Sequence, residues 1–230
     1  MPYPLPPAKD AFDATLARLD TLLGEITDQQ LLAPSRCHGW AVCDVLAHLH
    51  LGLQEAITAF AYRVDTPADT DFAQYWRGGP ADPPTADRDA EIAQIRFARL
   101  LASAYGRPSG LLRHLRPTVD ALRRFVAAAD DGQLAFQQRV LPVGDFVVTW
   151  AVEVAIHHLD VLVELPELPE PAPDGLALVA ATLDRLRGTS DRPGGWDETT
   201  YALKGAGRLP LSDAERAELG ATAERFPILG

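Results

Sequence analysis

Apolar residues recur at three- and four-residue spacing in four long stretches of the chain, which is the pattern of amphipathic helices. The first stretch covers about residues 9–25 and the second about residues 42–63. A third, over about residues 87–130, is interrupted at Gly106-Arg107-Pro108, and a fourth spans roughly residues 145–164. The spacing therefore predicts a mainly α fold built as a four-helix bundle.

Breaks in this pattern divide the chain. Residues 64–86 contain glycines and prolines that indicate a long loop, and four prolines between residues 166 and 173 indicate a stiff linker. We therefore expect a bundle over residues 1–165, a linker over 166–173 and a small C-terminal domain over 174–230. In that domain the pattern predicts a helix over 174–187, an extended stretch over 199–203 and a final helix from Ser212, where Ser212 and Glu215 fit a capping box. The C-terminal appendage is thus expected to be α+β.

Composition narrows the classes of function. Apolar residues make up 47% of the chain, but no uninterrupted apolar run approaches the roughly 20 residues of a membrane span. The N-terminus has neither a basic start nor an apolar signal core, so we expect a cytoplasmic protein with no membrane partner. The formal net charge of −11 would repel phosphate backbones and argues against nucleic acid. The two cysteines, Cys37 and Cys43, are interpreted as structural thiols.

Two titratable side chains interrupt the apolar face of the fourth helix. At 100° per residue, Glu153 and His157 project among Phe146, Trp150 and Val154. Burying a carboxylate without a partner costs several kcal/mol. A metal ion would satisfy both residues, because positions i and i+4 of a helix can chelate one ion. A Glu–His hydrogen bond in a wet core would satisfy them as well, and the spacing alone leaves both interpretations open.

A third ligand has to come from another helix, and the second stretch offers His48 and His50. Periodicity does not choose between them, because both flank the apolar stripe. We favour His48, since Asp44 and Gly52 lie one turn to either side and would supply a carboxylate behind the ligand and room for a bound molecule. Glu55, two turns further along, is either a fourth ligand or a solvated surface residue.

The remaining histidines and Asp160 are not predicted to be metal ligands. His158 points about 100° away from its neighbour and is interpreted as a packing residue or as a partner of a ligand. Asp160 lies near the edge of the same face, where it either orients an imidazole or meets solvent. His38 and His114 stand isolated in a loop and in the broken third helix, so we expect structural roles for both.

Three segments make the chain recognisable. The segment Ser35-Arg-Cys-His-Gly-Trp-Ala-Val-Cys-Asp-Val-Leu-Ala-His48-Leu resembles the helix-opening motif of the DinB/YfiT-like superfamily, especially its mycothiol-dependent maleylpyruvate isomerase branch. Glu153-Val-Ala-Ile-His157-His-Leu-Asp160 resembles the second motif of that branch. The ending, Lys204-Gly-Ala-Gly-Arg-Leu-Pro-Leu-Ser212 followed by Arg225-Phe-Pro-Ile-Leu-Gly230, resembles the tails of its members.

The resemblance implies a four-helix bundle that binds a divalent ion through His48, Glu153 and His157, with zinc as the first expectation and nickel or iron as alternatives. It departs from the family pattern at Trp150, where many members carry arginine one turn before the glutamate. The site is then more apolar than in those members, so we do not expect with certainty that this chain acts on the family's own substrate. Both a monomer and a homodimer are compatible with the sequence.

A site with two histidines and one glutamate leaves coordination positions open, as catalytic zinc sites do. A low-molecular-weight thiol bound there would lose its proton near neutral pH, and the resemblance indicates mycothiol. Arg208 is suited to bind a substrate carboxylate, or else is a surface arginine. The sequence thus predicts a thiol-dependent isomerase or S-transferase that acts on a small molecule. A metal-dependent hydrolase and a non-catalytic metal-binding or stress-response protein are the alternatives.

Overall fold

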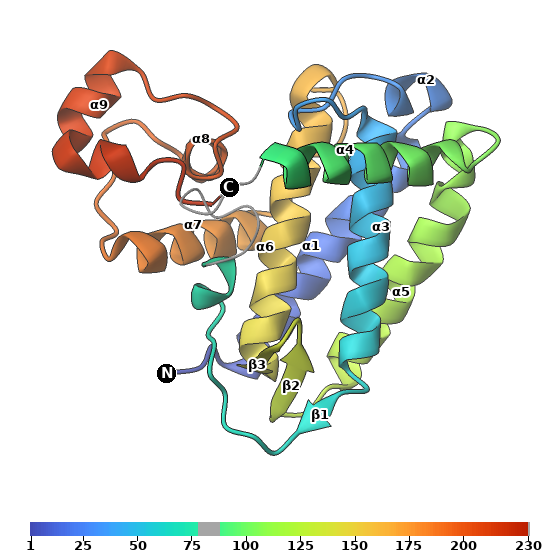
Figure 1. The fold of residues 1–230 in the computed structure, drawn as a ribbon, viewed down its shortest axis with the longest axis horizontal. Helices are drawn as coiled ribbons and strands as arrows, with labels where there is room; N and C mark the ends of the chain where they lie inside the picture. Colours follow the sequence, from blue (N-terminus) through green and yellow to red (C-terminus); the bar gives the residue numbers. More distant parts are fainter. Residues whose placement is uncertain (78–87, 230) are drawn as a thin grey trace.

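The computed structural model describes residues 1–77 and 88–229, and this part of the chain is mainly helical (Figure 1). Four long helices form the bundle: α1 (Leu5–Glu25), α3 (Val42–Ala59), α5 (Leu112–Ala128) and α6 (Val143–Val161). Both α1 and α3 pack against α5 and α6. The predicted mainly α fold with a four-helix bundle is confirmed.

Helix ends differ from the predicted ones for local reasons. Helix α1 begins at Leu5, because Pro6 and Pro7 occupy its first turn, where backbone N–H groups have no helical partner. The third stretch forms two helices, α4 (Arg88–Ser103) and α5, which are separated at the predicted break by the 3-10 turn Pro108–Gly110. Helix α4 crosses α3 at one end of the bundle (Figure 1). The predicted helix start at residue 87 and part of the predicted loop lie outside the described residues.

Helix α6 is the centre of the core. All of its residues except Glu153 are buried, so this helix has no solvent-facing side. By length and composition the segment Val143–Glu164, which includes the 3-10 turn Leu162–Glu164, could cross a membrane, but 83% of its most apolar window is buried within the protein. Its apolar character is therefore explained by packing inside the bundle.

A small antiparallel sheet closes the end of the bundle opposite α4 (Figure 1). Its strand order is β1 (Arg63–Val64), β2 (Gln133–Phe136) and β3 (Arg139–Pro142). The segment before the last bundle helix, for which the spacing predicted no element, forms the β2–β3 hairpin. The hairpin turn places Gln137 and Gln138 at φ values of 48° and 63°, the left-handed conformation that two-residue hairpin loops require.

The C-terminal part contains α7 (Pro173–Arg187), α8 (Glu198–Gly205) and α9 (Asp213–Leu219). The predicted helices over 174–187 and from Ser212 are confirmed, and the capping box of Ser212 and Glu215 is present. The prediction of an extended stretch over 199–203 was wrong, because these residues lie in α8. The first turn of α8 is capped by the Asp197 side chain, which accepts a hydrogen bond from the Thr200 N–H. Because no strand lies among the described residues after 173, the appendage is α rather than α+β.

Several shorter helical turns complete the fold. They are α2 (Asp28–Leu31) and the 3-10 turns Gln74–Trp76 and Gly220–Arg225.

The C-terminal helices continue the core of the bundle. Helix α7 packs against α1 and α6, and α8 packs against α7 and α6. A Cβ atom on Gly175 would lie 2.6 Å from Thr15 Oγ1 and 3.3 Å from the Ala155 Cβ, so only glycine permits this close approach. The division into bundle, linker and C-terminal domain stays a prediction. The packing brings the segment after α8 to the side of α6 that carries His157.

Candidate metal centre

Three of the predicted site residues meet between α3 and α6. His48 Nε2 lies 3.3 Å from Glu153 Oε1, and His157 Nε2 lies 3.2 Å from the same oxygen. The two imidazole rings stand nearly perpendicular, with centroids 5.0 Å apart and an interplanar angle of 79°. The three candidate ligand atoms all lie within 4.8 Å of one another, which is the spacing of a set that can share one ion.

A docked turn before α3 fixes the position of His48. The Ser35 hydroxyl and N–H both donate to the Trp40 carbonyl, and the Arg36 N–H donates to the Asp160 backbone carbonyl. This turn therefore anchors the start of α3 to the end of α6. The Trp40 ring packs on the His48 imidazole with centroids 5.2 Å apart, so the two ligand-bearing helices are held in register around the site.

A second layer of polar contacts supports His157 from behind. Its Nδ1 lies 3.0 Å from Asp160 Oδ2, and the side chain of Asp160 is fully buried. The Arg208 guanidinium donates through Nε to Asp160 Oδ1 and through Nη2 to Oδ2, each at 3.1 Å, while Nη1 donates to the Ala206 carbonyl. The Cys37 thiol donates to Asp160 Oδ2 at 3.1 Å. Asp160 thus orients an imidazole, which settles the two interpretations of this residue.

The charges of the cluster are mutually compensating. Burial disfavours ionised Glu153, but the charge of His157 and the hydrogen bonds from both imidazoles hold the pKa of Glu153 well below its usual value. Burial lowers the pKa of His157, yet Glu153 and the hydrogen bond to Asp160 raise it well above the ordinary histidine value. Asp160 is likewise kept ionised, because its bonds to His157 and the nearby Arg208 outweigh burial and lower its pKa. These directions favour two carboxylates paired with one arginine and one imidazolium.

The structure places His48 at the cluster. Both of the reasons given for preferring His48 to His50, which concerned Asp44 and Gly52, were wrong. Asp44 does not support His48, because its carboxylate accepts from the Ala41 N–H and caps the start of α3. Gly52 does not leave room for a bound molecule. A Cβ atom there would lie 2.9 Å from Cη2 of Trp150, so the space beside Gly52 is filled by the indole ring.

The other histidines lie away from the cluster. His50 is buried on another side of α3, where its ring centroid is 6.5 Å from that of His114. His114 Nδ1 in turn bonds the Tyr105 hydroxyl at 3.1 Å. His158 donates through Nε2 to the Pro169 carbonyl at 2.7 Å, and burial lowers its pKa to about 4, so it packs in neutral form as expected. His38 is exposed.

Cys37 belongs to the site, although sequence reasoning treated both cysteines as structural. It is half-buried and shares Asp160 Oδ2 with His157. Its position in the same motif as His48 was the signal that could have indicated this. Cys43 differs, because burial, followed by the charge of Asp44, raises the pKa of its thiol to about 11 and keeps it protonated.

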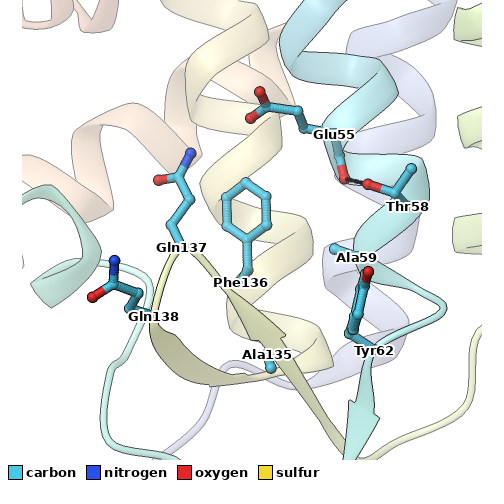
Figure 2. Close-up of a pocket in the computed structure, with 8 residues that line it drawn as sticks. All are labelled: Glu55, Thr58, Ala59, Tyr62, Ala135, Phe136, Gln137 and Gln138. Carbon is cyan, nitrogen blue, oxygen red and sulfur yellow. Dashed lines mark hydrogen bonds between the residues drawn. The ribbon is translucent and has the colours of Figure 1, made fainter.

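A surface pocket of about 300 Å³ lies further along α3, between that helix and the β2–β3 hairpin (Figure 2). Its Phe136 ring packs against Trp150, with centroids 6.0 Å apart. The Tyr75 hydroxyl donates to Gln137 Oε1, and its pKa is raised by burial and then by the charges of Glu153 and Glu55. Tyr75 thus lies within electrostatic reach of both the cluster and the pocket. Glu55 lines the pocket and is not part of the three-residue cluster.

The mainly helical four-helix bundle fits the class of DinB-like proteins. The model of one family in this class, the mycothiol maleylpyruvate isomerase N-terminal domain, matches residues 12–162. The chain belongs to this family. The matched segment carries all three residues of the cluster, whereas Arg208 lies beyond it.

One solved structure supports the fold. A point mutant of the mycothiol-dependent maleylpyruvate isomerase superposes with a TM-score of 0.50 at 14% identity, over 78% of this chain and 69% of its own. A second structure of the mycothiol-dependent maleylpyruvate isomerase gives a TM-score of 0.49 at 16% identity, with the same coverage. None of the curated proteins matches the chain. At 14% identity the first of these likenesses shows the fold alone.

Proposed function

We propose that this protein is a metal-dependent enzyme that uses a low-molecular-weight thiol, expected to be mycothiol, either to isomerise a small molecule or to transfer the thiol to it. His48, Glu153 and His157 hold the divalent ion. The family membership supports the thiol, and the geometry of the cluster supports the ion.

The observation that carries the proposal is the spacing of the ligand atoms. Two ligands bound to tetrahedral zinc at 2.0–2.1 Å lie roughly 3.3 Å apart. The distances from Glu153 Oε1 to the two imidazole nitrogens are 3.2 and 3.3 Å. Charge-assisted hydrogen bonds are usually shorter, at about 2.7–2.9 Å. The cluster is therefore spaced better for a shared ion than for a hydrogen-bonded core.

The charges favour a cation at the same point. Asp160 is matched by the permanent charge of Arg208. Among the described residues, the ion-pair partners of Glu153 are the two imidazoles, whose charge depends on protonation. An ion held by neutral imidazoles would replace the proton on His157 and supply the charge that the half-buried Glu153 carboxylate needs.

One side of the cluster is accessible and the other is closed. The side chains of His48 and Glu153 are 27% and 23% exposed to solvent. The side chain of His157 is 9% exposed and contacts Asp160 on its far side. A divalent cation bound there supplies the charge that stabilises a thiolate at neutral pH. The accessible side leaves room for the thiol to enter.

The surroundings indicate where the small molecule binds. Trp150 packs on Gly52 of α3 and against Phe136, which lines the pocket, and this makes the wall apolar. Glu55 stands seven residues beyond His48 on α3, or about 10 Å along the helix. A molecule that fills the pocket can thus extend to the cluster along an aromatic surface.

The metal is tested by its content in the purified protein. We expect close to one zinc, nickel or iron ion per chain, and loss of tight binding in His48→Ala, Glu153→Ala and His157→Ala. His50→Ala is the matched control, because it removes another buried histidine of α3 that lies away from the cluster. Full metal retention in the Glu153→Ala and His157→Ala proteins would refute the site and leave a hydrogen-bonded core.

The thiol is tested in cobalt-substituted protein. A thiolate that enters the coordination sphere adds a sulfur-to-metal charge-transfer band that water cannot produce. We expect this band with mycothiol in the native protein and its absence in His157→Ala. If neither mycothiol nor simpler thiols give the band at millimolar concentration, the thiol-dependent reaction is refuted, and hydrolysis or a non-catalytic role takes its place.

A further inference from the structure

Arg208 lies in the C-terminal part of the chain, beyond the segment that the family model matches. Its backbone N–H donates to the Leu203 carbonyl at 2.7 Å, at the end of α8. Its guanidinium reaches Asp160, which is on the last turn of α6. A residue of the C-terminal segment is therefore bonded to the bundle one side chain away from a candidate metal ligand.

The guanidinium is already occupied. Nε and Nη2 bind the two oxygens of Asp160 and Nη1 binds the Ala206 carbonyl, so the planar fork that would grip a substrate carboxylate is in use. The side chain of Arg208 is 18% exposed and that of Asp160 is fully buried. The expected role of Arg208 in binding a substrate carboxylate is not supported by this arrangement.

The geometry instead gives Arg208 an indirect role, and we propose that Arg208 is a positioning residue that aims His157 at the metal through Asp160. This inference rests on the metal site proposed above. The bidentate contact fixes the position of both oxygens of the buried carboxylate. In this position Oδ2 also accepts a hydrogen bond from the Nδ1–H of His157. Placing the proton on Nδ1 leaves the Nε2 lone pair free to bind the ion.

The fold keeps the arginine in place by its own packing. Gly207 adopts a φ of 72°, and a Cβ there would lie 3.1 Å from the ring of Pro227. The Gly205 carbonyl accepts from the N–H groups of Ile228 and Leu229 at 2.7 and 2.9 Å. The end of the chain thus clamps the turn that presents Arg208, so the C-terminal segment completes the metal site.

The experiment measures zinc affinity by competition with a chromophoric chelator. We expect Arg208→Ala to weaken binding by about 10- to 100-fold, the usual effect of removing a partner of a metal ligand. Arg208→Lys should lose less, because it keeps the charge without the fork. Millimolar guanidinium should restore part of the affinity to Arg208→Ala but not to Asp160→Ala, which has no carboxylate for it to hold.

A matched control separates positioning from general destabilisation. Arg192→Ala removes another arginine of the C-terminal part, which pairs with Asp184 at 2.9 Å and is 25% exposed. It should lower the melting temperature without changing zinc affinity. Equal affinity in native and Arg208→Ala protein, or an equal loss in Arg192→Ala, would overturn the inference.

A second readout works in metal-free protein. The Nδ1–H of His157, hydrogen-bonded to Asp160 and protected from exchange with solvent, should give a low-field proton resonance that is absent from His157→Gln. We expect Arg208→Ala to lose this resonance, since the freed carboxylate no longer holds the proton, and Arg192→Ala to keep it. A resonance that persists in Arg208→Ala overturns the inference. If native protein binds no metal but Arg208→Ala loses the resonance, the proposed function fails while the positioning role stands.

Discussion

The contact between Gly52 and Trp150 allows a stability change to be worked out from distances. A Cβ atom on Gly52 would lie 2.9 Å from Cη2 and 3.0 Å from Cζ3 of the indole. Carbon atoms in good contact are about 3.5–4.0 Å apart, so the ring has to move by roughly 0.5–1 Å. Overpacking of this kind costs about 1–3 kcal/mol, whereas replacing glycine by alanine inside a helix gains up to about 1 kcal/mol.

The matched control is Gly24, which is exposed near the end of α1 and has only the flexible tip of Arg116 within reach, at 3.8 Å. Gly24→Ala gains helix propensity without a clash. The two variants should therefore differ by the overpacking cost, about 2 kcal/mol. At about 2–4 °C per kcal/mol for a chain of this size, Gly52→Ala should melt about 6 °C below Gly24→Ala in thermal circular dichroism.

A double variant identifies the ring as the cause. Trp150→Phe removes the six-membered ring atoms that Gly52→Ala would strike, so the alanine should cost less in that background, with a coupling of about 1–2 kcal/mol. If Gly52→Ala melts at or above Gly24→Ala, or if the alanine costs the same in both backgrounds, the indole does not pack on the α3 backbone and the apolar wall of the proposed site is wrong.

Three further predictions follow from packing and charge. Leu183→Ala, in the core beside Gly205, should cost about 3 kcal/mol. One shared transition in tryptophan fluorescence and circular dichroism would show that the C-terminal helices unfold with the bundle, whereas two transitions would show separate domains. Chelation should lower the melting temperature but leave the helical signal intact, and unfolding at room temperature would contradict this. Lys204 and then the Ser212 N–H lower the pKa of Glu215 from 4.5 to about 2. The ionised Glu215 carboxylate therefore stabilises the fold fully above pH 4.5, and this stabilisation is lost as the pH falls towards 2. In urea titrations the difference in the free energy of unfolding between native protein and Glu215→Gln should shrink from pH 7 to pH 3.

Helical periodicity predicted the bundle because its four long helices bury apolar faces of regular spacing. The β2–β3 hairpin was missed because its turn uses Gln137 and Gln138 at positive φ, where glycine or asparagine is the usual signal. The helix α8 was missed because its start depends on a single cap at Asp197. Short elements of this kind carry too few residues for a period to show.

The candidate site could be predicted only in part. The pairing of Glu153 with His157 follows from helical spacing, which is local. The contacts of Asp160 with Cys37 and Arg208 join residues 123 and 48 positions apart, and no local pattern encodes them. The choice of His48 over His50 also depends on how α3 packs against α6, which is why the local arguments from Asp44 and Gly52 did not hold.

The burial of every α6 residue except Glu153 has a consequence for synthesis of the chain. Helix α1 packs against α6, but Val143–Val161 is made long after Leu5–Glu25. At about 5–20 residues per second, the first helix waits roughly 10 to 30 s before its partner leaves the ribosome. During that interval the apolar stripe of α1 has no native cover from α6, and the nascent chain depends on chaperones or on transient pairing with its other early helices to avoid aggregation.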